Sequence, residues 1–299
     1  MQAQHAEQSN PWVIDRKIGH GGQGEVYLAH HRNAPDMKVA LKYFKIFSEE
    51  TIERAQRSVR LLSACNRPEL PRFYDCGRPT AGLYYYAMEY VEGEGLDRRL
   101  KRGPLSAGEA RLLIFRLATV LADLHRVGLF HRDLKPSNVM LRPDGSPVLI
   151  DFDVLHDMLN PITGAFVLGT ANYFPPEILA GEDTSPHQQD LYGLGLLWAR
   201  CLGVPALQGS TEKVLARRLR QRCVDPQDRC PARDRRLIMA LTDRDPARRP
   251  ELSRMLWMLS VSTLPMNMYV FLAVFLVFWF LLLAGSLVFA STLSPLVSS

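Results

Sequence analysis

The chain has 299 residues, of which 47% are hydrophobic and 22% are charged, so it has enough apolar side chains for a sizeable globular core. Its formal charge of +5 is not accompanied by the interleaved basic and aromatic residues of a nucleic-acid reader module, and we expect no nucleic-acid partner. The five cysteines form neither a CxxC pair nor a Cys/His metal-ligand spacing, which favours a reduced, cytosolic setting over a disulfide framework.

The first part of the chain is predicted to be a short tail followed by a small sheet. The tail, residues 1–11, is polar at its start and lacks the apolar stretch of a secretory signal. Short β-type runs follow at residues 12–19, 25–31 and 38–44, and the turn residues between them predict antiparallel strands joined by hairpins. A helix is predicted to begin near Ser48. Its apolar positions recur at helical spacing, at Ile52, Ala55, Val59 and Leu62.

The next part of the chain is predicted to contain two more strands and then to become mainly helical. The strands are expected at residues 72–76 and 83–90. Gly93 and Gly95 follow, and they predict a flexible joint. The clearest helix is residues 107–125, because its apolar side chains fall on one face.

These elements, with an apolar run near the end of the sequence, predict the domain organisation. The fold is expected to be α+β, with a β-rich small lobe at residues 12–90 and a larger helical lobe at residues 91–260. A linker, residues 261–267, leads to Met268–Ala290, which runs for 23 residues without a charged side chain. At about 1.5 Å per residue such a helix spans a hydrocarbon core of roughly 30 Å, so we predict one transmembrane helix and a short tail at residues 291–299.

The charges beside the apolar run predict its orientation. Arg248, Arg249 and Arg254 lie just before it, whereas residues 291–299 carry no charged side chain, so the positive-inside rule places the large domain in the cytoplasm. Arginines are in fact crowded over residues 217–254. This crowding would suit an acidic surface partner, although we favour a solvated basic face.

Glycines and a strand lysine form the first group of candidate functional residues. Gly19, Gly21 and Gly24 have GxGxxGxV spacing between two predicted strands, where they are either plain turn residues or a backbone that closes over phosphates. No helix follows the last glycine, which argues against a dinucleotide-binding crossover. Lys42, in VALK, is either a snorkelling surface residue or the partner of a bound anion, because an unpaired ammonium in an apolar run is costly.

Two carboxylates and an amide form the second group. Asp133 and Asn138 lie in HRDLKPSN, and Asp151 begins DFD after a strand-like run. These side chains flank a short predicted hairpin and can converge on one point. One carboxylate could then accept a hydroxyl proton, while the other, with the amide, could supply oxygen ligands for Mg²⁺.

With these motifs the sequence resembles the eukaryotic-type serine/threonine protein kinase family, from Trp12 to about Ser260. The motifs that carry the resemblance are GxGxxGxV, VALK, HRDLKPSN, DFD, GTANYFPPE, the DLYGLG run of residues 190–195, and Arg249 with Pro250. The resemblance implies a bilobal protein-kinase-like fold, binding of ATP with Mg²⁺ or alternatively Mn²⁺, and transfer of the γ-phosphate to Ser and Thr hydroxyls of protein substrates.

The resemblance also implies a role for each matching residue. The three glycines would cover the phosphates of ATP, and Lys42 would bind its α and β phosphates. Asp133 would orient the substrate hydroxyl and accept its proton, and Lys135 would neutralise charge on the γ-phosphate. Asn138 and Asp151 would hold the metal ion. The residues implied around the adenine are Val26, Ala40, Met88, Glu89, Val91 and Met140.

Three positions depart from the family pattern. Ser58 stands where the family has the helix glutamate that pairs with the strand lysine, Asp153 replaces the glycine of DFG, and PPE replaces APE at Pro175–Glu177. These departures leave open a pseudokinase or nucleotide-binding scaffold with little turnover. We favour an active kinase because the residues implied for catalysis and metal binding are all present. The GTANYFPPE segment, which resembles a protein-substrate platform, counts against a small-molecule phosphotransferase.

The apolar run and the resemblance together imply a kinase that acts from the cytoplasmic face of a membrane. Its expected partners are ATP, protein substrates, the membrane through Met268–Ala290, and neighbouring copies of itself in autophosphorylation.

Overall fold

The structure is a computed structural model. It describes residues 11–21, 24–45, 49–80, 83–152, 170–182 and 184–260. The sites discussed below lie within one compact unit, Met1–Ser253.

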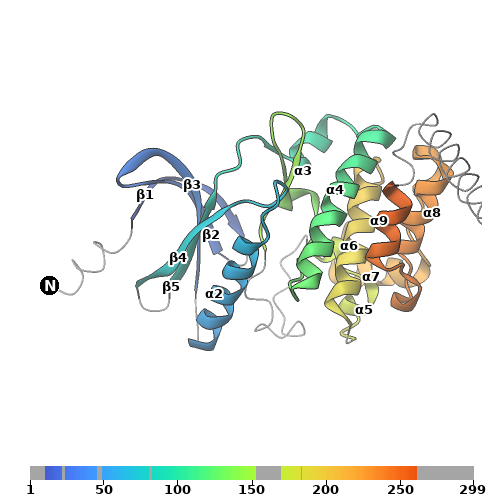
Figure 1. Ribbon diagram of the computed structural model, residues 1–299. Helices are drawn as coiled ribbons and strands as arrows, with labels where there is room; N and C mark the ends of the chain where they lie inside the picture. Colours follow the sequence, from blue (N-terminus) through green and yellow to red (C-terminus); the bar gives the residue numbers. More distant parts are fainter. Residues whose placement is uncertain are drawn as a thin grey trace, which may run out of the picture. The chain divides into compact units, whose positions relative to one another are not determined.

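The first lobe is built on a five-stranded antiparallel sheet in the order β1-β2-β3-β5-β4 (Figure 1). Its strands are β1 (Trp12–Gly21), β2 (Gly24–His31), β3 (Ala34–Lys45), β4 (Phe73–Thr80) and β5 (Leu83–Glu89). Helix α2 (Glu49–Ala64) packs on one face, where Ala55 and Val59 are buried in the same hydrophobic cluster as Ala40 and Phe44 of β3. The hairpins and the helix predicted for this lobe are therefore present.

The second lobe is mainly helical. Its longest helix, α4 (Ala107–Arg126), begins at a capping box in which Ser106 and Glu109 bond each other's backbone N–H groups. α4 packs against α6 (Pro186–Cys201), and α6 packs against α8 (Ala232–Leu241). Most of α6 is buried, so it forms the centre of this lobe, and the predicted α+β bilobal fold is confirmed. The other helices of the described residues are α3 (Leu96–Arg99), η1 (Leu100–Arg102), η2 (Pro136–Asn138), η3 (Thr170–Tyr173), α5 (Pro176–Leu179), α7 (Thr211–Arg220), η4 (Gln227–Arg229), η5 (Pro246–Arg248) and α9 (Leu252–Ser260).

A small second sheet follows the first lobe. It consists of β6 (Glu94–Gly95), β7 (Val139–Leu141) and β8 (Pro147–Leu149), in that order. Gly93 has a φ of 144°, and a β-carbon there would come within 1.9 Å of the Leu141 carbonyl oxygen. Gly93 therefore permits the close approach of the chain to β7, and the flexible joint expected from the sequence stays a prediction.

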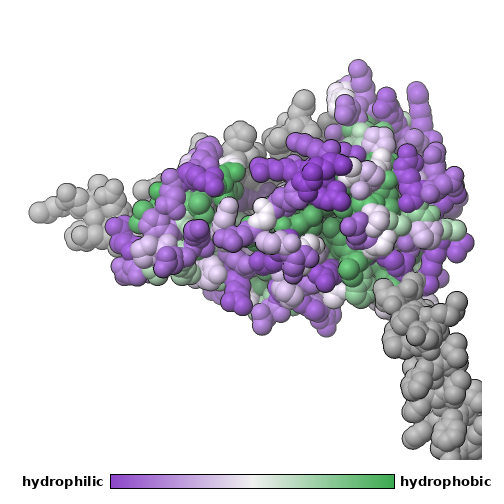
Figure 2. All heavy atoms as spheres, turned by 90° about the horizontal axis from the view of Figure 1, so that it is seen from above, coloured by the Kyte–Doolittle hydropathy of each residue, from purple (hydrophilic) through white to green (hydrophobic). Residues whose placement is uncertain are grey.

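Hydrophilic residues dominate the face of the molecule drawn in Figure 2, with hydrophobic residues exposed among them. Leu112, Val127 and Leu219 are examples of exposed apolar side chains in the helical lobe, and single exposures of this kind are normal for folded domains. Among the helices of the described residues, none is both long and apolar enough to cross a membrane. The predicted membrane segment, Met268–Ala290, lies outside the described residues.

Candidate active site

The first pair of charged side chains joins the two lobes. Strand β3 alternates its side chains between the faces of the sheet, so Lys42 lies on the same face as Ala40 and Phe44 and is only 5% exposed. Its ammonium forms an ion pair with the carboxylate of Asp151, which follows β8 by two residues. The same ammonium lies 6.0 Å from the centroid of the Tyr86 ring. Two residues that are 109 positions apart in the sequence therefore meet at one point.

The backbone and the charge of Asp151 are both unusual. Its φ is 65°, in the left-handed region that residues with a β-carbon rarely adopt. Burial acts to raise the pKa of its carboxyl, but Lys42, with smaller contributions from His131 and Lys135, holds that pKa below its ordinary value. Asp151 is therefore ionised at neutral pH, as a ligand for a metal cation must be.

The second group of polar side chains lies in the loop of residues 131–138. Lys135 Nζ donates to Asp133 Oδ2 at 2.5 Å, and Asn138 Nδ2 donates to the same oxygen at 3.1 Å. Asn138 Nδ2 also donates to the backbone carbonyl of Asp133 at 2.8 Å. Within the described part of the chain, the buried Oδ1 of Asp133 has no hydrogen-bond partner. This oxygen is an unused acceptor, which is what a catalytic base needs.

Helix α6 holds this loop in place through Asp190. The backbone N–H groups of His131 and Arg132 donate to its two carboxylate oxygens at 2.9 and 2.6 Å, and His125 Nε2 lies 2.8 Å from one of them. Gln189 Nε2 donates to the carbonyl of Arg132 at 2.7 Å. Arg132 has a φ of 63°, a strained backbone conformation next to Asp133. The hydrogen bonds to Asp190 and from Gln189 of α6 hold it in place.

Three of the residues predicted around the adenine share one hydrophobic cluster. They are Val26, Ala40 and Met88. Ala40 lies opposite Met88 in the β3–β5 pairing, and Val26 lies opposite Lys42 in the β2–β3 pairing. The sheet thus places apolar side chains beside the Lys42 ammonium.

The other predicted adenine residues lie where the chain passes between the lobes. Glu89 ends β5, and its carboxylate forms an ion pair with Arg142 at 2.7 Å. Val91 is buried, and Met140 on β7 lies opposite Gly95 of β6. The crossing segment is therefore tied to the helical lobe by one ion pair and one strand pairing.

The predicted phosphate-binding glycines lie in the β1–β2 hairpin. Gly24 has a φ of 152°, and a β-carbon there would lie 2.0 Å from the Tyr43 carbonyl oxygen, so close packing on β3 requires glycine. A β-carbon on Gly19 would meet only ordinary contacts, the nearest being Val26 at 3.7 Å. Gly21 ends β1. Phosphate binding by these glycines stays a prediction.

The structure describes two of the three departures from the family pattern. Ser58 is half-buried on α2, next to Val59 of the hydrophobic cluster. The carboxylate of Glu177, in PPE, accepts hydrogen bonds from both terminal nitrogens of Arg249, at 2.5 and 2.9 Å, and both side chains are buried. Asp153 lies outside the described residues.

The side chains present fit ATP and a divalent cation. An ionised Asp151 and the amide of Asn138 are hard oxygen ligands, and Mg²⁺ commonly takes one or two such ligands together with phosphate oxygens. Mn²⁺ suits the same oxygen ligands. Lys42 adds positive charge for phosphate at the same place.

Comparison with known proteins identifies the family. Residues 12–258 match the protein kinase domain family. The chain belongs to this family. Members of the family use ATP and a divalent metal ion.

Relatives of this protein kinase are longer bacterial proteins. It is 30% identical to serine/threonine-protein kinase pkn3 of Myxococcus xanthus over 258 residues, which cover 79% of this chain and 47% of the relative. It is 31% identical to PknH of Mycobacterium bovis over 214 residues, covering 69% and 35%. It is 33% identical to pkn2 of Myxococcus xanthus over 255 residues, covering 79% and 30%. The match spans about half or less of the length of these relatives.

Sequence reasoning gave no role to Asp190, although its carboxylate accepts hydrogen bonds from the backbone of the loop of residues 131–138. It is only 1% exposed. A carboxylate at the start of a long apolar run was the available signal, because a buried charge requires hydrogen-bond donors. Which donors it finds depends on the fold, since His131 lies 59 residues earlier in the chain.

Proposed function

We propose that the chain is an ATP-dependent serine/threonine protein kinase. The observation that carries this proposal is the arrangement of five side chains: Lys42 paired with Asp151, and Asp133 bonded by Lys135 and Asn138. Each stands at a position where the family resemblance implies a role in phosphoryl transfer. The names of the relatives support Ser and Thr, rather than Tyr, as the acceptor residues.

The geometry suggests how these side chains divide the work. Asp133 Oδ1 accepts the proton of the substrate hydroxyl, while the bonds from Lys135 and Asn138 to Oδ2 hold the carboxylate in place. Lys42 binds phosphate oxygens, exchanging its contact with Asp151 for them. Asp151 and Asn138 would hold Mg²⁺ or Mn²⁺, which when bound would supply positive charge for the transferred phosphoryl group.

The test of activity uses the full chain in detergent with labelled ATP, Mg²⁺ and a generic basic protein as acceptor. Wild-type protein should label the acceptor on Ser and Thr, and Asp133→Asn should lower the rate by about 10²- to 10⁴-fold. Asp36→Asn, at an exposed position of β3, is the matched control and should keep the wild-type rate.

Two outcomes would contradict this assignment. Transfer by Asp133→Asn at the wild-type rate would remove Asp133 from the mechanism. No transfer by wild-type protein with either Mg²⁺ or Mn²⁺, combined with retained binding of ATP, would favour the pseudokinase alternative.

We also propose that this kinase acts from the cytoplasmic face of a membrane. The kinase domain would span residues 12–260 and be joined by residues 261–267 to a transmembrane helix, Met268–Ala290, followed by a tail at residues 291–299. The uncharged run of 23 residues and the arginines that precede it support this arrangement. The seven linker residues reach roughly 25 Å when extended, so the domain would stay near the bilayer and near other copies.

Deletion of residues 268–299 tests the anchor. The truncated protein should leave the membrane fraction and keep near-normal activity toward a peptide. Its autophosphorylation should slow in dilute solution, because confinement to a membrane raises the effective concentration of neighbouring copies. Truncated protein that stays in the membrane fraction would disprove the anchor. Equal autophosphorylation rates at matched dilute concentration would disprove self-association as the anchor's benefit.

A further inference from the structure

One buried arginine of the helical lobe, Arg218, has no carboxylate partner among the described residues. Arg218, on α7, is 5% exposed, and its side-chain bond is from one terminal nitrogen to the carbonyl of Asn172 at 3.0 Å. The guanidinium carbon lies 5.6 Å from the centroid of the Tyr192 ring. Within the described part of the chain, the buried Nε of Arg218 has no hydrogen-bond partner. Burial also lowers the pKa of this guanidinium, the direction expected for a cation kept from water.

A second buried arginine, Arg249, packs on the same tyrosine and is paired with a carboxylate, as buried charges usually are. Arg249 lies 4.8 Å from the centroid of the Tyr192 ring on which Arg218 also packs. Its charge is matched by Glu177, through two hydrogen bonds. No carboxylate of the described residues pairs with Arg218 in this way. Of the two cations at Tyr192, Arg249 is therefore neutralised by Glu177, whereas Arg218 has no such partner in the described part of the chain.

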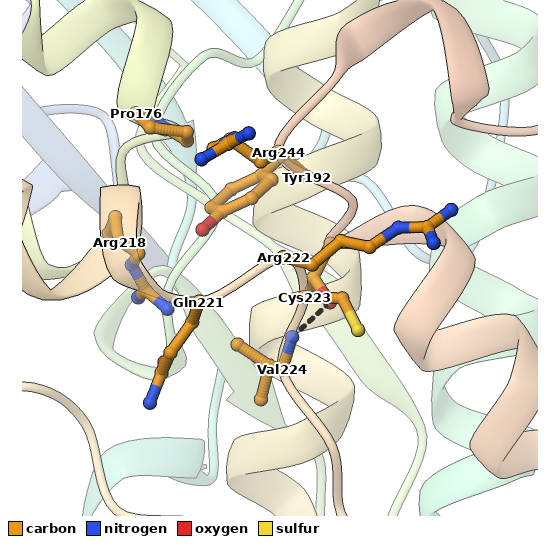
Figure 3. A pocket seen from close by; sticks show the side chains of 9 residues that line it. Pro176, Tyr192, Arg218, Gln221, Arg222, Cys223, Val224 and Arg244 are labelled. Atoms are coloured by element: carbon orange, nitrogen blue, oxygen red, sulfur yellow. Dashed lines mark hydrogen bonds between the residues drawn. The ribbon is translucent and has the colours of Figure 1, made fainter.

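Arg218 lines a pocket of about 560 Å³, within the range of roughly 300–1,000 Å³ typical of ligand pockets. The pocket lies between α6, α7, η3 and the segment that follows α6. Its apolar lining includes Leu196, Val204, Pro205, Leu207 and Met239. Figure 3 shows a smaller pocket that adjoins it, with Arg218 on the same side as the hydroxyl end of Tyr192. The smaller and the larger pocket share five lining residues: Arg218, Gln221, Arg222, Cys223 and Val224.

The charged side chains of the pocket leave an excess of positive charge. Arg200 also lines it and is half-buried. It donates to the carbonyl of Val204 at 3.4 Å and hydrogen-bonds the side chain of Tyr173, but it forms no ion pair with a carboxylate of the described residues. Arg222 lines it too and is paired with Asp243 at 3.2 Å. The one carboxylate among the lining residues, Asp225, already receives two hydrogen bonds from Arg235, at 2.8 and 2.7 Å.

The pocket adjoins the segment that resembles a protein-substrate platform. Asn172 and Tyr173 of η3 line it, and Arg218 bonds the Asn172 carbonyl directly. A substrate chain lying over this platform could therefore place a neighbouring side chain in the pocket. Apolar walls with unmatched guanidinium groups favour a carboxylate whose neighbour in the chain is apolar, because a charge-assisted hydrogen bond is strongest where water is excluded.

We propose that this pocket, which we call the α7 pocket, is a substrate subsite that binds an acidic residue of the protein substrate through Arg218 and Arg200. The inference rests on the proposed kinase function. It adds a specificity: substrates with Asp or Glu beside an apolar residue, near the phosphorylated Ser or Thr, are preferred.

A binding experiment tests the subsite without any turnover. The full chain in detergent is titrated with two fluorescent ten-residue peptides, identical except that two Glu residues flanking a central Leu in one are Gln in the other. Binding is followed by fluorescence anisotropy at low salt, which limits screening. The Glu peptide should bind about tenfold more tightly than the Gln peptide. Arg218→Met and, independently, Arg200→Gln should reduce this ratio below about twofold.

Arg217→Gln is the matched control, since Arg217 is exposed on α7, is adjacent to Arg218, and does not line the pocket. It removes one positive charge and should leave the ratio unchanged. Arg218 is buried, so Arg218→Met could unfold the protein. If Arg218→Met is unfolded, the test relies on Arg200→Gln alone. Equal binding of the two peptides overturns the proposal, as does an equal loss of the ratio in Arg217→Gln. Arg218-dependent binding of inorganic phosphate without preference for the Glu peptide also overturns it, in favour of a phosphorylated ligand.

A kinetic arm separates this inference from the proposed function. Serine peptides randomised at the flanking positions are phosphorylated by the full chain, and kcat/KM should be higher for acidic residues at one flanking position or more. Arg200→Gln should abolish this preference, whereas Arg217→Gln should keep both the preference and the kcat/KM for neutral peptides. A kinase that transfers phosphate with no acidic preference overturns the subsite alone. A chain that transfers no phosphate overturns the proposed function, and the anisotropy result then decides whether the α7 pocket binds acidic peptides.

Discussion

The candidate active site and the α7 pocket handle positive charge in opposite ways. In the active site, Lys42 has Asp151 and Lys135 has Asp133 as carboxylate partners. In the α7 pocket, no carboxylate of the described residues pairs with Arg218 or Arg200: Arg218 donates to the Asn172 carbonyl, and Arg200 bonds the Val204 carbonyl and the Tyr173 side chain. A phosphate that enters the active site must therefore exchange with an existing ion pair, whereas an anion that enters the pocket meets cations without carboxylates.

This difference predicts how each region responds to the loss of a charge. Removing one partner of a buried ion pair leaves the other charge uncompensated, which is strongly destabilising. Removing a buried cation that has no carboxylate partner carries no such penalty. The largest effects should therefore come from breaking pairs, and the smaller ones from altering groups that stand alone.

The largest effect is expected at the metal ligand of the active site. Asp151→Asn removes the ionised carboxylate, and Mg²⁺-dependent phosphoryl transfer should fall by at least about 10³-fold, because the metal supplies much of the stabilisation of the transition state. The measurement is the initial rate with labelled ATP, with circular dichroism to show that the variant is folded. Asp97→Asn, a half-buried carboxylate on α3, is the control. Transfer by Asp151→Asn within tenfold of wild type would remove Asp151 from the metal site.

The next largest effect is expected in the unfolding free energy, where the two arginines that pack on Tyr192 can be compared. Glu177→Gln leaves the buried Arg249 without a carboxylate, and this should cost about 3–5 kcal/mol of unfolding free energy. Arg218→Met should change it by no more than about 1 kcal/mol, because an apolar side chain replaces an unmatched charge. Both values come from urea unfolding of the full chain in detergent, followed by tryptophan fluorescence.

Glu182→Gln provides the control for the Glu177 variant, since Glu182 is exposed and follows the turn at the end of α5. It should stay within about 0.5 kcal/mol of wild type. A larger cost for Arg218→Met than for Glu177→Gln would show that Arg218 is satisfied in the free protein, and the contrast between the two cations would fail.

The sequence predicted what local patterns determine. Period-two strands and hairpin turns in the first lobe, and the apolar face of α4, follow from neighbours in the chain, so these elements form close to their expected bounds. Asp133, Asn138 and Asp151 were expected to converge because one short hairpin separates them, and β7 and β8 form that hairpin. Their individual roles stay predictions.

Features that depend on distant residues were not predictable in this way. The role of Gly93 depends on the Leu141 carbonyl, and Arg218 meets Asn172 from 46 positions away. In the sequence, Arg218 is one of many arginines between residues 217 and 254, most of which suit a solvated face. Only the fold shows that this one is buried and that no carboxylate of the described residues pairs with it.

A smaller effect is expected from adding a carboxylate near the active site. Ser58→Glu introduces the acid that the family pattern has on this helix, and activity should stay within about threefold of wild type or rise, since one surface-type ion pair contributes little. Ser63→Glu, the same substitution at an exposed position of α2, is the control. Initial rates at saturating ATP measure both variants. A strong loss in Ser58→Glu alone would show that another acidic group already occupies that place.

The smallest effect concerns His187, whose ring packs on His125, a neighbour of Asp190. Burial and the neighbouring His125 lower the pKa of His187 below its ordinary value of 6.5, although Glu251 and Asp190 oppose them, and the two imidazole rings lie 4.7 Å apart. A group with a lower pKa in the folded state binds more protons when unfolded, so His187 should reduce stability as the pH falls from about 6.5 through its folded pKa. Melting temperatures of full-length protein between pH 7.5 and pH 5 should therefore fall less steeply for His187→Gln than for wild type. An unchanged slope in His187→Gln would show that its protonation is not linked to folding.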